Sequence, residues 1–237
     1  MVETDVILLN KIQLFQGLSD DALHTVVKAA REKSFDEGSY IFYQDDPAER
    51  IYVLRSGRLK LFQLSDDGQQ VLMRVMTAGM MFAAIGLVEG AKYPVSAEAA
   101  DRCEVIYWPR ATMLDLINLY PTLAVNALKV LAGHVREFQD RYRELATERV
   151  ERRVARTVLR LAAQTGRKTE EGVLIDIPLT RQDLAEMSGT TLFTVSRILS
   201  QWETQGLVAA GREKVVIRFP HGLVRIAEDL PVRKKAE

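Results

Sequence analysis

The sequence predicts an α+β fold with three parts: an antiparallel β domain, a long helix and a C-terminal winged helix-turn-helix. Three patterns indicate this fold. Short β-branched and aromatic runs alternate with turn residues between residues 32 and 108. A heptad of apolar residues follows residue 121, and near the C-terminus two short helical segments meet at a glycine before a β-rich stretch. The 237 residues suffice for one or two domains.

The first part of the chain is predicted to begin with short helices and to continue as strands. Residues 5–30 hold two apolar helical stretches, and Ser19 is placed to cap the second. The runs SYIFYQ, RIYVLRSGRLKLFQL, QQVLMRVM and CEVIYW then alternate with turn residues. Gly57 and Gly68 separate such runs and are predicted to form hairpin turns. Many short strands at even spacing indicate an antiparallel barrel or jelly roll.

A long helix is predicted to start near Pro121, a residue suited to a first helical turn. Apolar residues then recur at alternating steps of four and three. Such a heptad seam indicates a partner helix, whereas packing against the chain's own β domain would favour a broader stripe. We therefore expect a homodimer with an interface formed by Ala124, Leu128, Leu131, Val135, Phe138, Tyr142 and Leu145.

A further helix is predicted at residues 147–164. The side chains expected to face inward are Val150, Val154, Val158, Leu159 and Leu161. The opposite side holds the arginine row Arg152, Arg153, Arg156 and Arg160. We interpret this row as a solvated face, with phosphate contact as the alternative.

Residues 179–207 are predicted to form two short helices joined by a tight turn. Gly189 interrupts the helical pattern where a sharp turn needs positive φ, and Thr190 or Thr191 can cap the second helix. One face of that helix is apolar, with Val195, Ile198, Leu199 and Trp202. The opposite face carries Phe193, Ser196, Arg197, Ser200 and Gln201. The pattern is typical of a helix-turn-helix, although an ordinary helical hairpin would show it too.

The neighbours of this motif favour binding to double-stranded DNA. Thr180, Arg181 and Gln182 stand at the start of the first helix, where hydroxyl, guanidinium and free N–H groups can hold phosphates. The stretch LVAAGREKVVIRF is similar to the hairpin wing of a winged helix, and HGLVRIAEDL predicts a short extra helix. Residues 147–237 hold 16 Lys and Arg against 12 Asp and Glu, whereas residues 1–146 hold 16 against 20. The basic half therefore contains the motif.

What the sequence lacks disfavours several other functions. Cys103 is the single cysteine, which excludes an internal disulfide and a cysteine-built zinc or iron–sulfur site within one chain. Its place in CEVIYW favours a buried structural residue over a thiol switch. No Gly-rich phosphate loop, metal-spaced cluster or activated nucleophile is evident, so we expect neither an enzyme nor a metal site. No run is apolar enough to span a membrane, so we expect a cytoplasmic protein without a membrane partner.

The segment FDEGSYIFYQDDPAERIYVLRSGRLKLFQLSDDGQQVL resembles the effector domain of the CRP/FNR family of bacterial transcription regulators. The motifs that carry the resemblance are Gly38, Asp46-Pro47-Ala48-Glu49, Ser56-Gly57 and the TVSRIL of residues 194–199. It implies a cyclic-nucleotide-binding-like jelly-roll effector domain at residues 1–120, a dimerisation helix at 121–146 and a winged helix-turn-helix domain at 147–237. It also implies a dimer that binds a pseudo-palindrome, responds to a signal in the β domain and has RNA polymerase as a partner.

The resemblance also suggests how DNA is read. The family's recognition helix commonly carries a Glu-Thr pair, then Ser or Gly, then Arg, and Thr194, Ser196 and Arg197 fit those positions. We expect Arg197 to bind a guanine in each half-site and Gln201 to lie on the same face. Phe193 stands where much of the family has Glu, and it could touch thymine methyl groups or fold against the domain. Phosphate contacts are assigned to Thr180, Arg181, Gln182 and Thr191.

The identity of the signal is left open. Ala83 and Ala84 stand at the Gly-Glu positions of the family's cyclic-nucleotide branch, and no Arg precedes Ser96, which argues against cyclic AMP. The single cysteine argues against the iron–sulfur branch. Haem bound by His134 is an alternative, although a lone helix histidine is more often a surface or packing residue. A small apolar effector, or none, completes the alternatives. The predicted effector pocket comprises Ala83, Ala84, Tyr93, Ser96 and Phe138.

The favoured function is therefore a homodimeric DNA-binding transcription regulator. The alternative is a nucleotide-sensing module that regulates a partner protein. The missing phosphate-binding residues and the complete helix-turn-helix both argue against that alternative.

Overall fold

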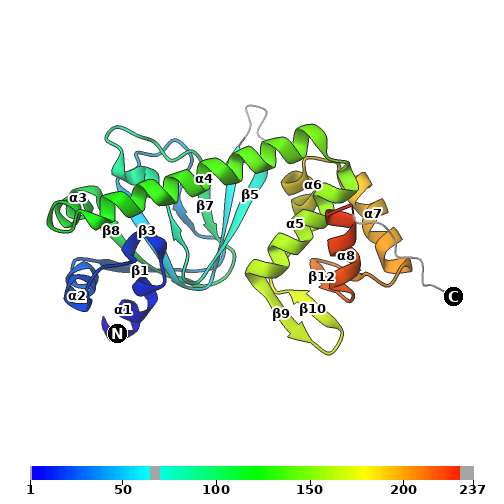
Figure 1. Ribbon diagram of the computed structural model, residues 1–237, viewed down its shortest axis with the longest axis horizontal. Coiled ribbons are helices and arrows are strands. Elements are labelled where there is room, and N and C mark those ends of the chain that lie inside the picture. The colour runs from blue at the N-terminus through cyan, green and yellow to red at the C-terminus, as the bar shows by residue number, and fades with distance from the viewer. Residues whose placement is uncertain (1, 65–69, 230–237) are drawn as a thin grey trace. The chain divides into compact units, whose positions relative to one another are not determined.

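The computed structural model describes residues 2–64 and 70–229 and divides the chain into two compact units, Met1–Gln139 and Asp140–Glu237 (Figure 1). The boundary falls inside the long helix α4 (Thr122–Thr147). The predicted domain limits at residues 120 and 146 differ from this division and stay predictions. In the described part of the chain no single helix is long and apolar enough to span a membrane. Among these residues only α3 (Arg110–Leu119) and α4 taken together, across a bend of 117°, meet that requirement by length and composition.

The first unit contains two four-stranded antiparallel sheets, as the predicted jelly roll requires. One sheet has the order β1 (Arg31–Phe35), β8 (Cys103–Pro109), β3 (Arg50–Ser56), β6 (Met81–Phe82). The other has the order β2 (Tyr40–Phe42), β7 (Ser96–Ala99), β4 (Arg58–Leu64), β5 (Gln70–Thr77). Aromatic rings fill the core between them: Phe42 stacks on Tyr93 with centroids 3.9 Å apart, and Tyr52 on Phe82 at 5.1 Å.

Gly57 has a different role from the predicted hairpin turn. It joins β3 to β4, but these strands belong to different sheets and do not pair with each other. Its φ is 84°, and a Cβ at this position would collide with the carbonyl oxygen of Arg102. The hairpin expected around Gly68 is confirmed by the pairing of β4 with β5, although Gly68 itself lies outside the described residues.

Four helices cover one sheet of the first unit: α1 (Val2–Asn10), the short η1 (Gln13–Phe15), α2 (Asp20–Lys28) and α3 (Arg110–Leu119). Ser19 caps α2 as predicted, accepting a hydrogen bond from the Ala22 N–H at 3.3 Å. The indole N–H of buried Trp108 donates to the Val26 carbonyl at 2.8 Å, which ties α2 to β8. Helix α3 is absent from the predicted elements, because only Met113 and Leu116 are buried along it.

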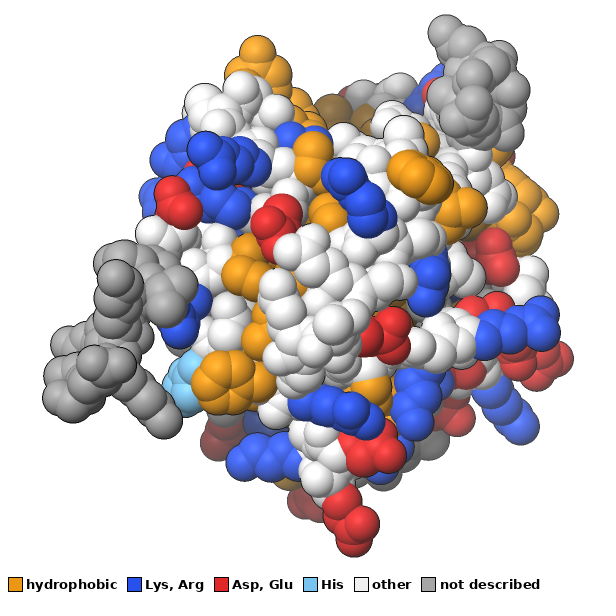
Figure 2. Space-filling model, turned by 90° about the vertical axis from the view of Figure 1, so that its right-hand side faces the viewer, with side chains coloured by type: hydrophobic (Ala, Val, Ile, Leu, Met, Phe, Trp, Pro, Cys, Tyr) orange, Lys and Arg blue, Asp and Glu red, His pale blue; other side chains and the backbone are white. Residues whose placement is uncertain are grey.

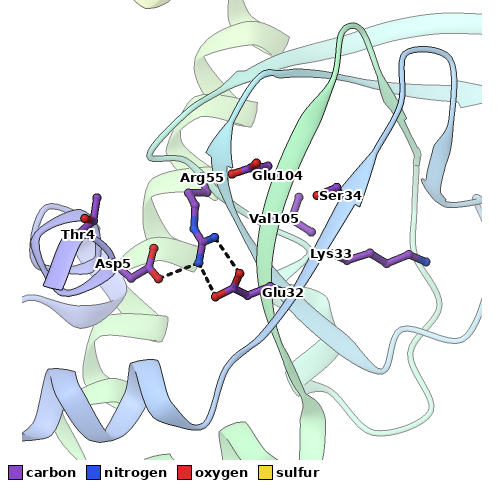
Figure 3. Close-up of a pocket in the computed structure, with 8 residues that line it drawn as sticks. All are labelled: Thr4, Asp5, Glu32, Lys33, Ser34, Arg55, Glu104 and Val105. Carbon is purple, nitrogen blue, oxygen red and sulfur yellow. Dashed lines mark hydrogen bonds and ion pairs between the residues drawn. The ribbon is translucent and has the colours of Figure 1, made fainter. Parts of the chain in front are cut away.

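An ion-pair cluster joins α1 to the β domain (Figure 3). The Arg55 guanidinium lies 2.7 Å from the Asp5 carboxylate and 2.9 Å from that of Glu32. The hydrogen bond from Arg55 lowers the pKa of Glu32, and the two carboxylates raise the pKa of Arg55. At the pocket drawn in Figure 3, the charges of Asp5, Glu32 and Arg55 are therefore already paired with one another within the fold.

The second unit is a winged helix-turn-helix. Helix α5 (Val150–Thr165) is followed by β9 (Gly166–Thr169), β10 (Gly172–Ile175), α6 (Arg181–Ser188), α7 (Leu192–Thr204), β11 (Val208–Gly211), β12 (Lys214–Ile217) and α8 (Pro220–Ala227). The predicted wing is confirmed, because β11 and β12 pair as an antiparallel hairpin. They form one sheet with β10 and β9, which the sequence patterns did not reveal. Trp202 is fully buried at the centre, and its indole N–H donates to the Glu151 carboxylate at 3.0 Å.

The interpretation of the α5 arginine row as a solvated face is wrong. Arg160 and Arg156 lie 3.1 and 3.4 Å from the Glu144 carboxylate, at the end of α4. Arg152 lies 2.6 Å from Glu148 and, like Arg156, donates to the Ala227 carbonyl of α8. Their side chains are largely buried because acidic partners and carbonyl groups from distant segments cover them. The row is thus committed to holding helices together.

Candidate nucleic-acid interface and effector cavity

The turn of the helix-turn-helix is set by local hydrogen bonds and one glycine. Thr180 begins α6 with a capping box: its hydroxyl accepts from the Asp183 N–H at 2.9 Å, and its own N–H donates to the Asp183 carboxylate at 2.8 Å. Gly189 ends α6 in the left-handed conformation with φ 62°. The Thr191 hydroxyl then accepts from the Thr194 N–H at 3.2 Å and starts α7. Of the two threonines predicted as caps, Thr191 is the one used.

Helix α7 has the two faces that the sequence predicts. Its buried residues are Val195, Ile198, Leu199 and Trp202. The opposite side presents the exposed side chains of Phe193, Arg197, Ser200 and Gln201, with Thr194 and Ser196 half-buried at its margin. Spacings of three and four residues bring these groups onto one surface. Figure 2, which faces the α7 side of Figure 1, shows Lys and Arg side chains interspersed with Asp, Glu and hydrophobic side chains over that view.

The predicted phosphate contacts lie at the beginning of α6. Gln182 is exposed and its amide donates to Glu186 at 2.8 Å, while Arg181 and Thr180 are half-buried. The Thr180 hydroxyl already accepts the capping bond, so only its O–H remains as a donor for an anion. The free N–H groups of the first turn point along the helix axis in the manner that phosphate binding requires.

Arg153 positions the turn and was missed as a functional residue. Its guanidinium donates three hydrogen bonds of 2.9 Å each, to the carbonyl oxygens of Ser188, Gly189 and Glu148. These bonds join α5 to the end of α6 and to the segment after α4. No sequence pattern could reveal this role, because the acceptors are backbone groups brought close only by folding.

A cavity of about 580 Å³ lies between the β domain and α4 in the first unit. Its wall comprises Phe42, Leu61, Ala83, Ala84, Ile85, Leu87, Val88, Tyr93, Pro94, Val95, Ile117, Ala124, Ala127, Leu128, Val130, Leu131 and His134. This wall includes no Lys, Arg, Asp or Glu. The Tyr93 hydroxyl is engaged with the Arg50 backbone, donating to its carbonyl at 3.1 Å, so the cavity is almost entirely apolar.

The structure brings together only part of the predicted effector pocket. Ala83, Ala84 and Tyr93 line the cavity. Ser96 is not among the wall residues, because its buried hydroxyl accepts a hydrogen bond from the Gln44 N–H at 2.9 Å. Phe138 is also not a wall residue: it lies on α4 one turn beyond His134 and is 70% exposed. His134, considered from the sequence as a haem ligand, does line the cavity. The other wall residues of α3 and α4 were not indicated, because they are distant in sequence from the β domain.

Burial shifts the pKa of two titratable groups in the first unit. Burial lowers the pKa of His134, and the nearby Arg74 charge lowers it further. Cys103 is fully buried, and its thiol donates to the carbonyl oxygen of Arg58 at 3.1 Å. Burial raises the pKa of the Cys103 thiol to about 11. These contacts confirm the interpretation of Cys103 as a structural residue.

Comparison with known families identifies both units. The sequence model of the cyclic nucleotide-binding domain matches residues 32–120, and that of the Crp-like helix-turn-helix domain matches residues 152–226. The chain belongs to the CRP/FNR family. It therefore has the helix-turn-helix DNA-binding domain of a transcription regulator.

Relatives of this CRP/FNR protein span almost its whole length. The CRP-like cAMP-activated global transcriptional regulator of Mycobacterium tuberculosis is 24% identical, covering 93% of this chain and 98% of the relative. The cyclic AMP receptor protein of Thermus thermophilus is 28% identical over 90% and 96%. The solved structure of FixK2 from Bradyrhizobium japonicum matches with a TM-score of 0.71 and 26% identity, covering 83% of this chain and 96% of FixK2.

The predicted dimer seam of this CRP/FNR protein is a largely exposed apolar stripe along α4. Exposed large side chains on it are Leu128, Leu131, Val135, Phe138, Tyr142 and Leu145, and Ala124 is half-buried at its start. Leu145, the last residue of the stripe, lies against Gly189: a Cβ added to Gly189 would collide with the Leu145 side chain. Leu145 therefore packs against the turn of the helix-turn-helix.

Proposed function

We propose that the protein is a homodimeric transcription regulator that binds a pseudo-palindromic DNA site through α7 and is controlled by a signal at the apolar cavity. The observation that carries the proposal is the exposed face of α7, with Arg197 among polar side chains directly opposite a fully packed apolar face. A helix with this construction is suited to enter the major groove while its other side is held by the domain.

The DNA contacts divide into two groups. The Arg197 guanidinium can bind both major-groove acceptors of a guanine, which is worth about 1–3 kcal/mol of discrimination against another base. Phosphate contacts come from Arg181 and Gln182 in the first turn of α6 and from the cap residue Thr191. These contacts contribute equally to the binding of any DNA sequence. Two recognition helices related by a dimer axis would read half-sites about 10 bp apart.

The α4 stripe supports dimerisation. Leu128 is 67% exposed and Phe138 70%, so much of the heptad is uncovered in the single chain. A second α4 packed along the same stripe would bury these side chains in a two-helix coiled coil. We expect Leu131→Glu to convert the dimer to a monomer in light scattering. Ala132→Glu, one residue off the stripe, is the matched control that should leave the dimer intact.

The cavity supports an uncharged, apolar signal molecule. The curated relatives named above are described as cAMP-activated or as a cyclic AMP receptor, but the wall of this cavity offers no cation to a cyclic phosphate. A phosphate taken out of water without a partner charge is strongly disfavoured. Leu128 and Leu131 belong both to the cavity wall and to the dimer stripe, so a ligand could change the dimer through them.

Selection from a random duplex pool tests the proposal. The full-length protein should enrich a palindrome with a guanine in each arm, and Arg197→Ala should lose the preference for that guanine. Arg167→Ala, which removes an exposed arginine of β9 from the same unit, should retain the motif. Added cyclic AMP should leave the affinity unchanged. Failure to hold any DNA would refute the regulator and favour a module acting on a partner protein.

A further inference from the structure

The first turn of α7 presents an aromatic side chain to solvent. Phe193 is 77% exposed, so it does not fold against its own domain, and its neighbour Leu192 is 48% exposed. Both residues directly follow the helix cap Thr191 at the N-terminal end of α7. In a recognition helix the N-terminal residues are the ones that contact base edges. Phe193 and Arg197 are four residues apart on the helix and therefore share one face.

A hydrocarbon ring has few ways to distinguish base pairs in the major groove. It can neither donate to the purine acceptors nor accept from the amino group of cytosine or adenine. The thymine C5-methyl group is the apolar feature that the groove displays, and contact with it is the base-specific interaction open to Phe. The exposed ring would be removed from water by that contact, which makes the contact favourable.

The spacing of the two side chains limits where such a thymine can lie. Four residues of α-helix rise about 6 Å along the axis. Successive base pairs are separated by about 3.4 Å. If Arg197 binds guanine, Phe193 reaches an edge within about two base pairs of it.

We propose that Phe193 is a specificity-determining residue that reads a thymine methyl group within two base pairs of the guanine bound by Arg197. The inference rests on the proposed DNA-binding function and adds the base class read at a second position. The recognised half-site thus contains an apolar contact in place of the carboxylate-to-cytosine contact that a Glu at this position would make.

Replacing individual thymines by deoxyuridine tests this contact, because the change removes only the methyl group. The duplex is the site selected by the wild-type protein, and affinity is measured by fluorescence anisotropy at fixed salt. We expect deoxyuridine at the contacted thymine to raise Kd about fourfold for each half-site. Phe193→Ala should bind the thymine and deoxyuridine duplexes equally. Deoxyuridine more than two base pairs from the guanine is the matched DNA control and should have no effect.

The outcomes separate the two proposals. If wild-type protein holds no DNA, the DNA-binding function fails and this inference fails with it. If it holds DNA without selecting a motif, the assignment of a base contact to Phe193 is overturned. If it selects a site with the guanine but no thymine within two base pairs, or binds both duplexes equally, only the role of Phe193 is overturned. Phe193→Glu provides a gain-of-function check: its preference at that position should move from thymine to cytosine. Because Phe193 is exposed, each variant should unfold at the wild-type temperature.

Discussion

Replacing Arg153 by Lys tests whether one planar side chain holds the recognition motif in place. The three hydrogen bonds to the carbonyls of Ser188, Gly189 and Glu148 are each 2.9 Å long and come from different nitrogens of one guanidinium. A hydrogen bond from a charged donor contributes about 1.5–3 kcal/mol, and simple addition would overestimate the effect because the side chain is partly solvated. A Lys ammonium has a different geometry and can satisfy one of the three carbonyls. We expect a loss of about 2–3 kcal/mol in the free energy of unfolding of the second unit.

Urea unfolding followed by Trp202 fluorescence measures this loss. The chain has one tryptophan in each unit, so a Trp108→Phe background isolates the signal of the second unit. The matched control is Arg160→Lys: Arg160 pairs with Glu144 at 3.1 Å, an ion pair that Lys can retain, and the expected loss is below about 1 kcal/mol. Equal unfolding midpoints for Arg153→Lys and its parent, or equal losses for both variants, would refute the argument from guanidinium geometry.

Three further predictions follow from the same structure. Gly189→Ala should lower the free energy of unfolding by about 1–2 kcal/mol, because the backbone there is left-handed. A further loss should come from the collision of the new Cβ with Leu145. Urea unfolding of the double mutant with Leu145→Ala should show that this second loss is removed. Cys103, with its pKa raised to about 11, should resist iodoacetamide at pH 8 until the protein unfolds, and rapid labelling of the folded protein would contradict this. The contribution of its neutral thiol to the free energy of unfolding should disappear as pH rises from about 9 to 11. The pKa of His134 is lower in the folded protein than in the unfolded chain, so folding favours the neutral imidazole. Its contribution to the free energy of unfolding should be fully present above pH 6.5 and lost as pH falls through the lowered pKa. His134→Gln should abolish this pH dependence in acid unfolding curves.

The elements that depend on neighbouring residues were predictable from sequence. The buried face of α7, the caps Ser19 and Thr191 and the left-handed Gly189 all depend on spacings of one to four residues, and the structure confirms each of them. The strands of the β domain and the wing hairpin follow from alternating and β-branched runs, and they too are found. Local periodicity sets these features because they arise within one helical turn or one strand.

The partners of side chains were not predictable in the same way. The α5 arginines have the pattern of a solvated face, yet Arg156 and Arg160 pair with Glu144 across a chain reversal. Gly57 has the sequence features of a hairpin turn, yet it connects two sheets. In each case the decisive neighbour is distant in sequence, so the pattern around the residue carries no information about it.

The sequence by itself determined that this chain is a β domain, a long helix and a winged helix-turn-helix, because propensity, capping and hydrophobic period all act locally. Only the tertiary structure decided which groups are accessible. It left Phe193 exposed on α7, placed Ser96 and Phe138 outside the cavity wall, and formed an apolar cavity between the β domain and α4. Accessibility is a property of packed surfaces, and it depends on every segment that folds over a residue.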